Sequence, residues 1–298
     1  MLAFAFAEFV QQIVSGLATG SIFASLALAL VLIYRSTNVV NFAQGEMAMF
    51  TTYIAWALMD RGLSYWPAFL LTLAIAFTGG AAIERTIIRP FEQKSALAIV
   101  IVTIGLLIAL NGAAGWIWGA EVKAFDSPFP NTTWDVGGVA ISSQDVGTFC
   151  VCLATVALLW AFFNLTPLGL AMRASAINPT TSRLVGVRVG WMLALGWGLA
   201  AVLGAIAGMM AAPTVFLDPN MMLVILIYAF AAAVLGGIDS PIGAVVGGLS
   251  LGVLLNLIGR YVDFIGPELR LPTALLVLLG VLMIRPQGLF GHAVVRRV

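Results

Sequence analysis

Long apolar runs, separated by short polar stretches, account for most of the chain. With charged residues and Pro/Gly-rich stretches as boundaries, the apolar segments lie at about 10–33, 39–58, 66–83, 96–118, 147–163, 191–214, 220–236, 242–262 and 272–284. A helix needs roughly 20 apolar residues to cross the hydrocarbon core of a bilayer. The pattern therefore predicts an all-α, polytopic transmembrane helical bundle that forms one transmembrane domain over residues 1–298.

The seventh and eighth segments are short and are joined by LGGIDSPIG. Gly236, Gly237 and Pro241 should interrupt a helix, because glycine weakens helices and proline lacks the backbone N–H. We expect a broken or re-entrant helix pair near 220–262. Two counts remain open: eight full spans with one irregular segment, or nine spans.

Composition agrees with a lipid environment. The 298 residues are 61% hydrophobic and only 9% charged, with a mean hydropathy of +1.06. Soluble domains usually carry about 25% charged residues. The net charge of +1 gives no reason to expect a nucleic-acid partner.

Catalytic chemistry is not expected in this chain. The single histidine, His292, lies in the tail, and no P-loop motif is present. These features disfavour His-based catalysis and ATP binding by a P-loop. We therefore expect no catalytic residue, no metal site and no cofactor within the chain, and we do not expect an enzyme.

Lys and Arg gather on alternate loops, which predicts the orientation. The richer set of loops carries Arg35, Arg85, Arg89, Lys94, Arg173, Arg183, Arg188, Arg285, Arg296 and Arg297. The poorer set carries Arg61, Lys123, Arg260 and Arg270. The N-terminus should then lie outside and the C-terminus in the cytoplasm. This places the loop at about 119–146 outside and the loop at about 164–190 inside.

Both long loops contain local structure signals. In the outer loop, Val136 and Val139 flank Gly137-Gly138, which predicts a tight hairpin turn between short strands. Such a hairpin would serve as a lid that docks a partner or as a passive cap.

In the inner loop, Asn178 suits an N-cap, Pro179 the first helical position and Gly186 the position after the helix. These residues predict a short helix of about two turns. The helix would be gripped by another protein or would form an ordinary amphipathic connector.

A polar stripe is expected on the second segment. On a helical wheel, Asn38, Asn41, Gln44 and Thr52 fall within one sector of roughly 120°, together with small residues. Such a stripe is typical of a helix that lines a solute path.

Glu46 lies roughly 80° or more from this stripe and is the one carboxylate placed inside a span. A charge at the bilayer centre costs on the order of 3 kcal/mol. Two interpretations remain open. Glu46 would orient a solute, pair with a partner subunit or carry a proton; alternatively, it would lie near the helix start, where the helix dipole favours its charge.

Glycines four residues apart recur at Gly16/Gly20, Gly204/Gly208, Gly243/Gly247 and Gly248/Gly252. In membranes such pairs let helix backbones approach closely. We interpret them as sites of tight helix packing.

Several longer motifs resemble a known family. They are NFAQGEM at 41–47, ERTIIRPF at 84–91, the stretch around 103–106, GLAMRASAINPTTSRLVGVRV at 169–189, AAAVLGGIDSPIGAVVGG at 231–248 and RPQGLFG at 285–291. In this order they resemble the permease of a bacterial ABC importer for branched-chain amino acids. Specifically, the chain is similar to the shorter, H-type permease subunit, over nearly its whole length.

The resemblance implies a pore-forming subunit for branched-chain amino acids or related small polar solutes, and relatives also carry urea, amides or carboxylates. It implies a second related permease, two cytoplasmic ATPase subunits that bind ATP and Mg, and an extracytoplasmic solute-binding protein, in the bacterial inner membrane. It assigns the 173–186 segment as a coupling helix docked on an ATPase, with Arg173, Ala174, Asn178, Pro179, Arg183 and Gly186 as its candidate residues.

Two alternatives to this interpretation come from other classes. One is an ion- or proton-coupled secondary transporter or channel that uses Glu46. The other is a membrane scaffold without a solute route. The translocation path expected for an importer contains Asn38, Asn41, Gln44, Glu46 and Thr52.

Overall fold

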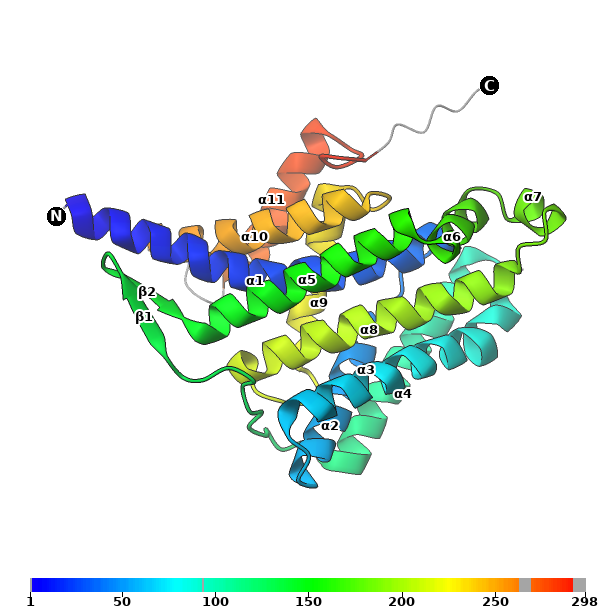
Figure 1. The fold of residues 1–298 in the computed structure, drawn as a ribbon. Coiled ribbons are helices and arrows are strands. Elements are labelled where there is room, and N and C mark those ends of the chain that lie inside the picture. Colours follow the sequence, from blue (N-terminus) through cyan, green and yellow to red (C-terminus); the bar gives the residue numbers. More distant parts are fainter. Residues whose placement is uncertain (1, 93, 263–268, 292–298) are drawn as a thin grey trace. The chain divides into compact units, whose positions relative to one another are not determined.

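Helices make up most of the structure, a computed structural model that describes residues 2–92, 94–262 and 269–291 (Figure 1). They are α1 (Leu2–Thr37), α2 (Gln44–Asp60), α3 (Tyr65–Ile83), α4 (Ala96–Trp118), α5 (Ser143–Leu165), α6 (Pro167–Ile177), α7 (Pro179–Leu184), α8 (Val189–Val215), α9 (Met221–Gly236), α10 (Pro241–Tyr261) and α11 (Arg270–Ile284). The predicted all-α fold is confirmed. The tail residues Arg296, Arg297 and His292 lie outside the described residues.

Within the described part of the chain, six helices are long and apolar enough to cross a membrane: α1, α4, α5, α8, α10, and α3 together with the turns that extend it to Phe91. The helices α9 and α11 are also apolar but shorter. The chain is thus a multi-pass membrane protein. The predicted number of eight to nine spans and the orientation of the termini remain predictions.

The chain divides into two compact units, and the boundaries fall inside α1, α5 and α9 and in the loop between Asp126 and Ser127. Unit 1 comprises Met1–Leu28, Ser127–Leu153 and Val224–Val298, and unit 2 comprises Ala29–Asp126 and Ala154–Leu223.

In unit 1, glycines bring α1 and α10 into backbone contact. A methyl group added at Gly252 would lie 2.3 Å from the Cα of Gly20, and one added at Gly248 would lie 2.4 Å from the Cα of Ala24. Neither space can hold a side chain. This close approach is the packing role predicted for the glycine pairs Gly16/Gly20 and Gly248/Gly252.

The predicted hairpin is present in unit 1. Strands β1 (Thr133–Val136) and β2 (Val139–Ser142) pair in antiparallel fashion, with Val136 opposite Val139. Gly137 and Gly138 both have positive φ, 66° and 85°. Two adjacent residues with positive φ are what a two-residue type I′ turn requires, and glycine adopts them without strain.

The predicted helix break is also present in unit 1. Helix α9 ends at Gly236, and α10 begins at Pro241 after Gly237, whose φ of 110° is outside helical geometry. The Ser240 side chain caps α10 by accepting a hydrogen bond from the N–H of Gly243 at 3.1 Å. A re-entrant path for this pair remains a prediction.

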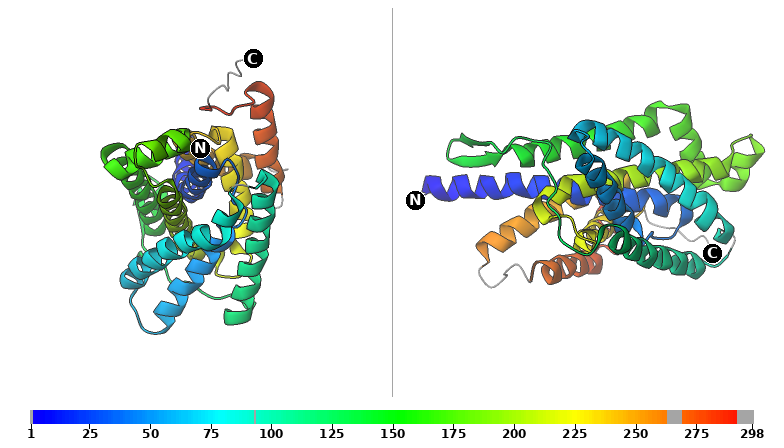
Figure 2. Two further views of the ribbon diagram at one scale, coloured as in Figure 1. Left: turned by 90° about the vertical axis from the view of Figure 1, so that its right-hand side faces the viewer. Right: turned by 90° about the horizontal axis from the view of Figure 1, so that it is seen from below.

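In unit 2, α8 packs against both α2 and α3, and these helices run side by side (Figures 1 and 2). Gly80 of α3 faces the carbonyl of Trp197, and Gly198 of α8 faces Phe77, with an added Cβ only 2.7 and 2.9 Å from these neighbours. Because later residues of α3 meet earlier residues of α8, the two helices are antiparallel.

The α1–α10 contact gives a stability prediction. Gly252→Ala should destabilise the purified chain by about 1–3 kcal/mol, since its methyl group would overlap the α1 backbone. Gly105→Ala on α4 is the matched control, because nothing lies within 4 Å of its added Cβ. Thermal unfolding in detergent measures both variants. Equal midpoints for the two would contradict the packing interpretation.

Candidate functional site

Helix α2 begins at Gln44, later than the predicted segment start. The prediction that Asn38 and Asn41 lie on the α2 helix is therefore wrong. The side-chain oxygen of Asn41 accepts a hydrogen bond from the N–H of Ala43 at 3.0 Å, and Asn38 has a φ of 54°. Asparagine competes with helical hydrogen bonding in this way, so these residues form the turn before the helix.

The remaining stripe residues on α2 face α8. The Gln44 amide donates to the carbonyl of Ala200 at 2.9 Å, and Asn41 donates to the Gln44 side-chain oxygen at 3.2 Å. The Thr52 hydroxyl lies next to Gly208, where an added Cβ would approach it to 2.3 Å. Asn41, Gln44 and Thr52 are all buried, whereas Asn38 is exposed. The structure thus brings three of the four stripe residues to one helix–helix contact.

These contacts also determine where along the axis of α8 the helix α2 begins. Gln44 meets Ala200 and Gly204, and Thr52 meets Gly208, so α2 and α8 run in the same direction. Ala200 lies about 17 Å along the axis from Val189, at about 1.5 Å per residue. Because α8 has 27 residues, α2 starts beside the middle of α8 rather than beside its end.

Glu46 points toward α4 on the other side of α2. The residue is 1% exposed, and its carboxylate accepts a hydrogen bond of 3.4 Å from the amide of Asn111. The same amide nitrogen donates to the carbonyl of Pro219 at 2.8 Å and approaches the Asn220 side-chain oxygen at 3.3 Å. Two amide hydrogens cannot fully serve three acceptors.

Both interpretations of Glu46 therefore find support in geometry. Glu46 lies in the first turn of α2, where the helix dipole favours a negative charge. Yet this turn lies near the middle of α8, and no ion pair to Glu46 occurs within the described ranges. A buried carboxylate with one long hydrogen bond is under-compensated.

The predicted inner helix is α7, and its local signals are confirmed. The Asn178 side chain accepts a hydrogen bond from the N–H of Thr181 at 3.0 Å, Pro179 occupies the first turn, and Gly186 has a φ of 86°. The candidate coupling residues Arg173 and Ala174 lie instead on α6, which ends where Asn178 caps α7. The segment is therefore two helices joined at Asn178.

This segment exposes apolar side chains in an otherwise polar stretch. Ile177, Leu184 and Val185 are 81%, 83% and 75% exposed, and Arg183 beside them is also exposed. An apolar groove of about 530 Å³ lies between α6 and the start of α8, lined in part by Leu168, Ala171 and Trp191. Exposed apolar groups rimmed by polar residues are typical of interaction sites.

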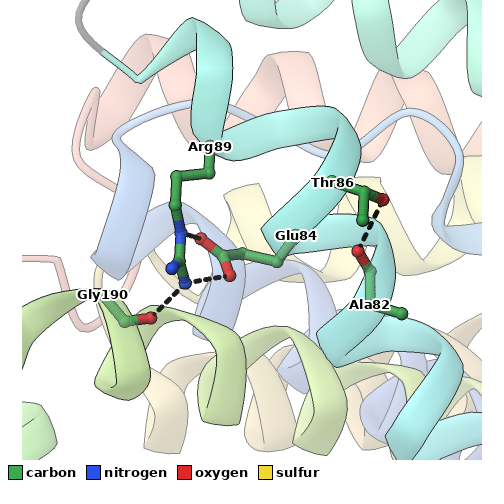
Figure 3. Close-up of polar contacts among 5 residues, drawn as sticks. All are labelled: Ala82, Glu84, Thr86, Arg89 and Gly190. Carbon is green, nitrogen blue, oxygen red and sulfur yellow. Dashed lines mark hydrogen bonds and ion pairs between the residues drawn. The ribbon is translucent and has the colours of Figure 1, made fainter.

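Nothing in the sequence indicated an ion pair after the end of α3, in which Glu84 is buried and Arg89 is partly exposed. Glu84 is 0% exposed, and Arg89 contacts both of its oxygens, at 3.1 and 2.7 Å (Figure 3). Glu84 is the first residue of the π-helix η1 (Glu84–Ile88), and Arg89 is the first residue of the 3₁₀ turn η2 (Arg89–Phe91) that follows it. The spacing of five gave no signal, because α-helical neighbours are three or four apart, whereas a π turn brings residues five apart together.

The fold and these contacts define a multi-pass helical membrane protein with a buried polar helix start and an exposed pair of short helices. Residues 12–285 match the family described as "Branched-chain amino acid transport system / permease component". The chain is 32% identical to the high-affinity branched-chain amino acid transport system permease protein BraD of Pseudomonas aeruginosa, over 98% of each chain. It is 30% identical to LivH of Escherichia coli, over 98% of this chain and 99% of that one.

A solved structure supports the fold. The structure described as PsaBC from Streptococcus pneumoniae in complex with Fab superposes with a TM-score of 0.50 at 15% identity, covering 95% of this chain and 97% of that one. This likeness concerns the fold alone. The family match covers most of the chain, so the chain belongs to the branched-chain amino acid transport system permease family.

The α7 cap gives a second prediction. Asn178→Ala should destabilise α7 locally by about 1 kcal/mol, because the N–H of Thr181 loses its acceptor. Amide hydrogen exchange over 179–184 should accelerate, while exchange over α4 stays unchanged. Asn178→Asp keeps the acceptor and is the matched control. Unchanged exchange in Asn178→Ala would show that the cap does not stabilise the helix.

Proposed function

We propose that this chain is the pore-forming permease subunit of an ATP-driven importer for branched-chain amino acids or related small polar solutes. It works by alternating access in the bacterial cytoplasmic membrane, with the N-terminus outside and the C-terminus inside. A second related permease completes the pore, and two cytoplasmic ATPase subunits bind ATP and Mg. An extracytoplasmic binding protein delivers the solute.

The observation that carries the proposal is the exposed segment α6–α7 in a chain of this family. Its apolar residues Ile177, Leu184 and Val185 are more than 70% exposed, and the Asn178 cap holds α7 in a fixed form. Apolar side chains held this far out favour a protein partner that covers them. We assign Arg173, Ala174, Asn178, Pro179, Arg183 and Gly186 to the coupling segment that docks on an ATPase.

The solute route is proposed to follow α2. Asn41, Gln44, Glu46 and Thr52 are buried in the structure, and Asn38 lies in the turn before the helix. A route here requires α2 and α8 to separate. Gly204 and Gly208 hold no side chain between these helices, so a small separation would uncover the polar groups of Gln44 and Thr52. Alternating access would then open and close this contact.

Glu46 supports a second candidate function, an ion- or proton-coupled transporter without an ATPase. A buried carboxylate that accepts a single hydrogen bond of 3.4 Å from the residues that the structure describes is suited to bind a proton or a cation. This alternative predicts gradient-driven uptake by the lone chain in liposomes, abolished by Glu46→Gln.

The first test is affinity purification from the native membrane with mass spectrometry of what copurifies. A related permease and P-loop ATPases should be recovered. Leu184→Ser with Val185→Ser should lower ATPase recovery about tenfold or more, as expected when apolar interface anchors are removed. Val136→Ser in β1, an exposed apolar position in unit 1, is the control and should leave recovery unchanged. A chain recovered alone that still transports would overturn the importer assignment.

The route has its own test. Asn41→Leu with Gln44→Leu should abolish ATP-driven uptake while the complex still assembles, because the polar stripe loses its hydrogen-bonding groups. Thr51→Val is the matched control: Thr51 is buried in α2, and its hydroxyl bonds only within that helix. Radiolabelled leucine uptake into proteoliposomes measures both variants. Normal uptake by the double variant would exclude the stripe from the route.

A further inference from the structure

The ion pair of Glu84 and Arg89 also contacts the helix α8. One terminal nitrogen of Arg89 donates to Glu84 at 2.7 Å and also to the carbonyl oxygen of Gly190 at 2.6 Å (Figure 3). We name Glu84, Arg89 and the Gly190 carbonyl the α3–α8 clamp. Its guanidinium joins the end of α3 to the first turn of α8. Planar, bidentate arginine contacts of this kind are strong and geometrically specific.

Local structure is arranged around the clamp. The π-helix η1 replaces the last α-helical turn, and the N–H of Arg89 bonds the carbonyl of Glu84. Single π turns are uncommon and are often found at functional sites. At the other end, a Cβ on Gly190 would lie 3.3 Å from the guanidinium carbon of Arg89. Glycine therefore leaves the space that the guanidinium fills.

One further contact joins the same elements, and electrostatic interactions extend from them to α7. The guanidinium of Arg85 lies over the ring of Trp191, 5.4 Å from its centroid. Burial raises the pKa of Glu92 above its usual value; the nearby Glu84 adds to this rise, and the charges of Arg89 and Arg183 oppose it. Arg183 belongs to α7, so the charges around the clamp extend to the coupling segment.

Gly190 lies between the coupling segment and the part of α8 that contacts α2. Gly190 follows α7 by a few residues and begins the helix that meets α2 at Ala200, Gly204 and Gly208. A displacement of α7 would be passed along the chain to the membrane-spanning helix α8 at Gly190.

We propose that Glu84 and Arg89 are positioning residues that make α3 and α8 move as one body, so that a displacement of the coupling segment reaches the α2–α8 contact. The inference rests on the proposed function of α6–α7 as an ATPase-docking segment. Glu84 and Arg89 touch neither the solute nor ATP. They determine how much transport each hydrolysed ATP produces.

The experiment uses the complete transporter, with both permeases, the ATPases and the binding protein, in proteoliposomes. Leucine uptake and ATP hydrolysis are measured together for Glu84→Gln and Arg89→Gln. Hydrolysis should persist, while leucine transported per ATP falls about fivefold or more, the usual size of a coupling effect. Glu8→Gln, which removes the exposed Glu8–Arg260 ion pair of unit 1, should leave the ratio unchanged.

A milder pair of variants keeps the inference testable if those proteins assemble poorly. Gly190→Ala displaces the guanidinium, whereas Gly196→Ala meets only the end of Met172 at 3.6 Å. The transport-to-hydrolysis ratio should fall for the first and not for the second. Arg89→Lys should restore part of the ratio, because it keeps the charge but loses one of the bridging contacts.

The outcomes are distinguishable. An unchanged ratio in Glu84→Gln, Arg89→Gln and Gly190→Ala overturns the clamp, including the case in which uptake and hydrolysis fall in proportion, since that result indicates a purely structural pair. Recovery of ATPases with the wild-type chain tests the proposed function separately. A wild-type chain that binds no ATPase overturns both proposals.

Discussion

Close approach of helix backbones at α8 is the constraint on which the rest of unit 2 depends. Lipid tails are as apolar as the side chains they surround, so membrane helices associate through tight contact rather than through exclusion of water. Gly198 admits Phe77 of α3, and Gly204 and Gly208 admit Gln44 and Thr52 of α2. Larger residues at these positions would separate both neighbours from α8. The polar groups on α2 could then no longer reach their partners.

Polar groups inside this unit follow from the same closeness. The Thr52 hydroxyl bonds the carbonyl of Ala48 within its own helix, and the Gln44 amide reaches across to Ala200. Glu84 is buried, and both of its carboxylate oxygens accept hydrogen bonds from the guanidinium of Arg89. Glu46 is the contrast, with one long hydrogen bond from Asn111. The difference separates a carboxylate that is fixed in one ion pair from one that is suited to change partners during transport.

Features encoded by neighbouring residues could be predicted from the sequence. The bounds of α4 at Ala96–Trp118, the Asn178 cap with Pro179, the Gly137-Gly138 turn and the break before Pro241 all depend on local backbone chemistry. The start of α2 was missed because the Asn41 side chain bonds Ala43 and so competes with the helix. The Glu84–Arg89 pair depends on a π turn, and the residue types of this segment do not predict one. The position of Glu46 along the axis of α8 depends on contacts between α2 and α8, which are far apart in the sequence.

The late start of α2 connects the two candidate sites. If α2 spanned the full length of α8, the two helices would share a long contact, and any separation would have to break all of it. Because α2 begins beside the middle of α8, the contact covers only the second half of α8, from about Ala200 onward. The first half of α8 packs against α3 through Gly190 and Gly198, and α3 continues into the second half, where Gly80 lies against Ala201. One helix thus has a first half that begins beside the coupling segment and a buried second half that packs closely against the polar stripe of α2. With this division, a displacement at Gly190 would move α8 relative to α2 and open the contact between Thr52 and Gly208. The packing between α3 and α8 would be kept.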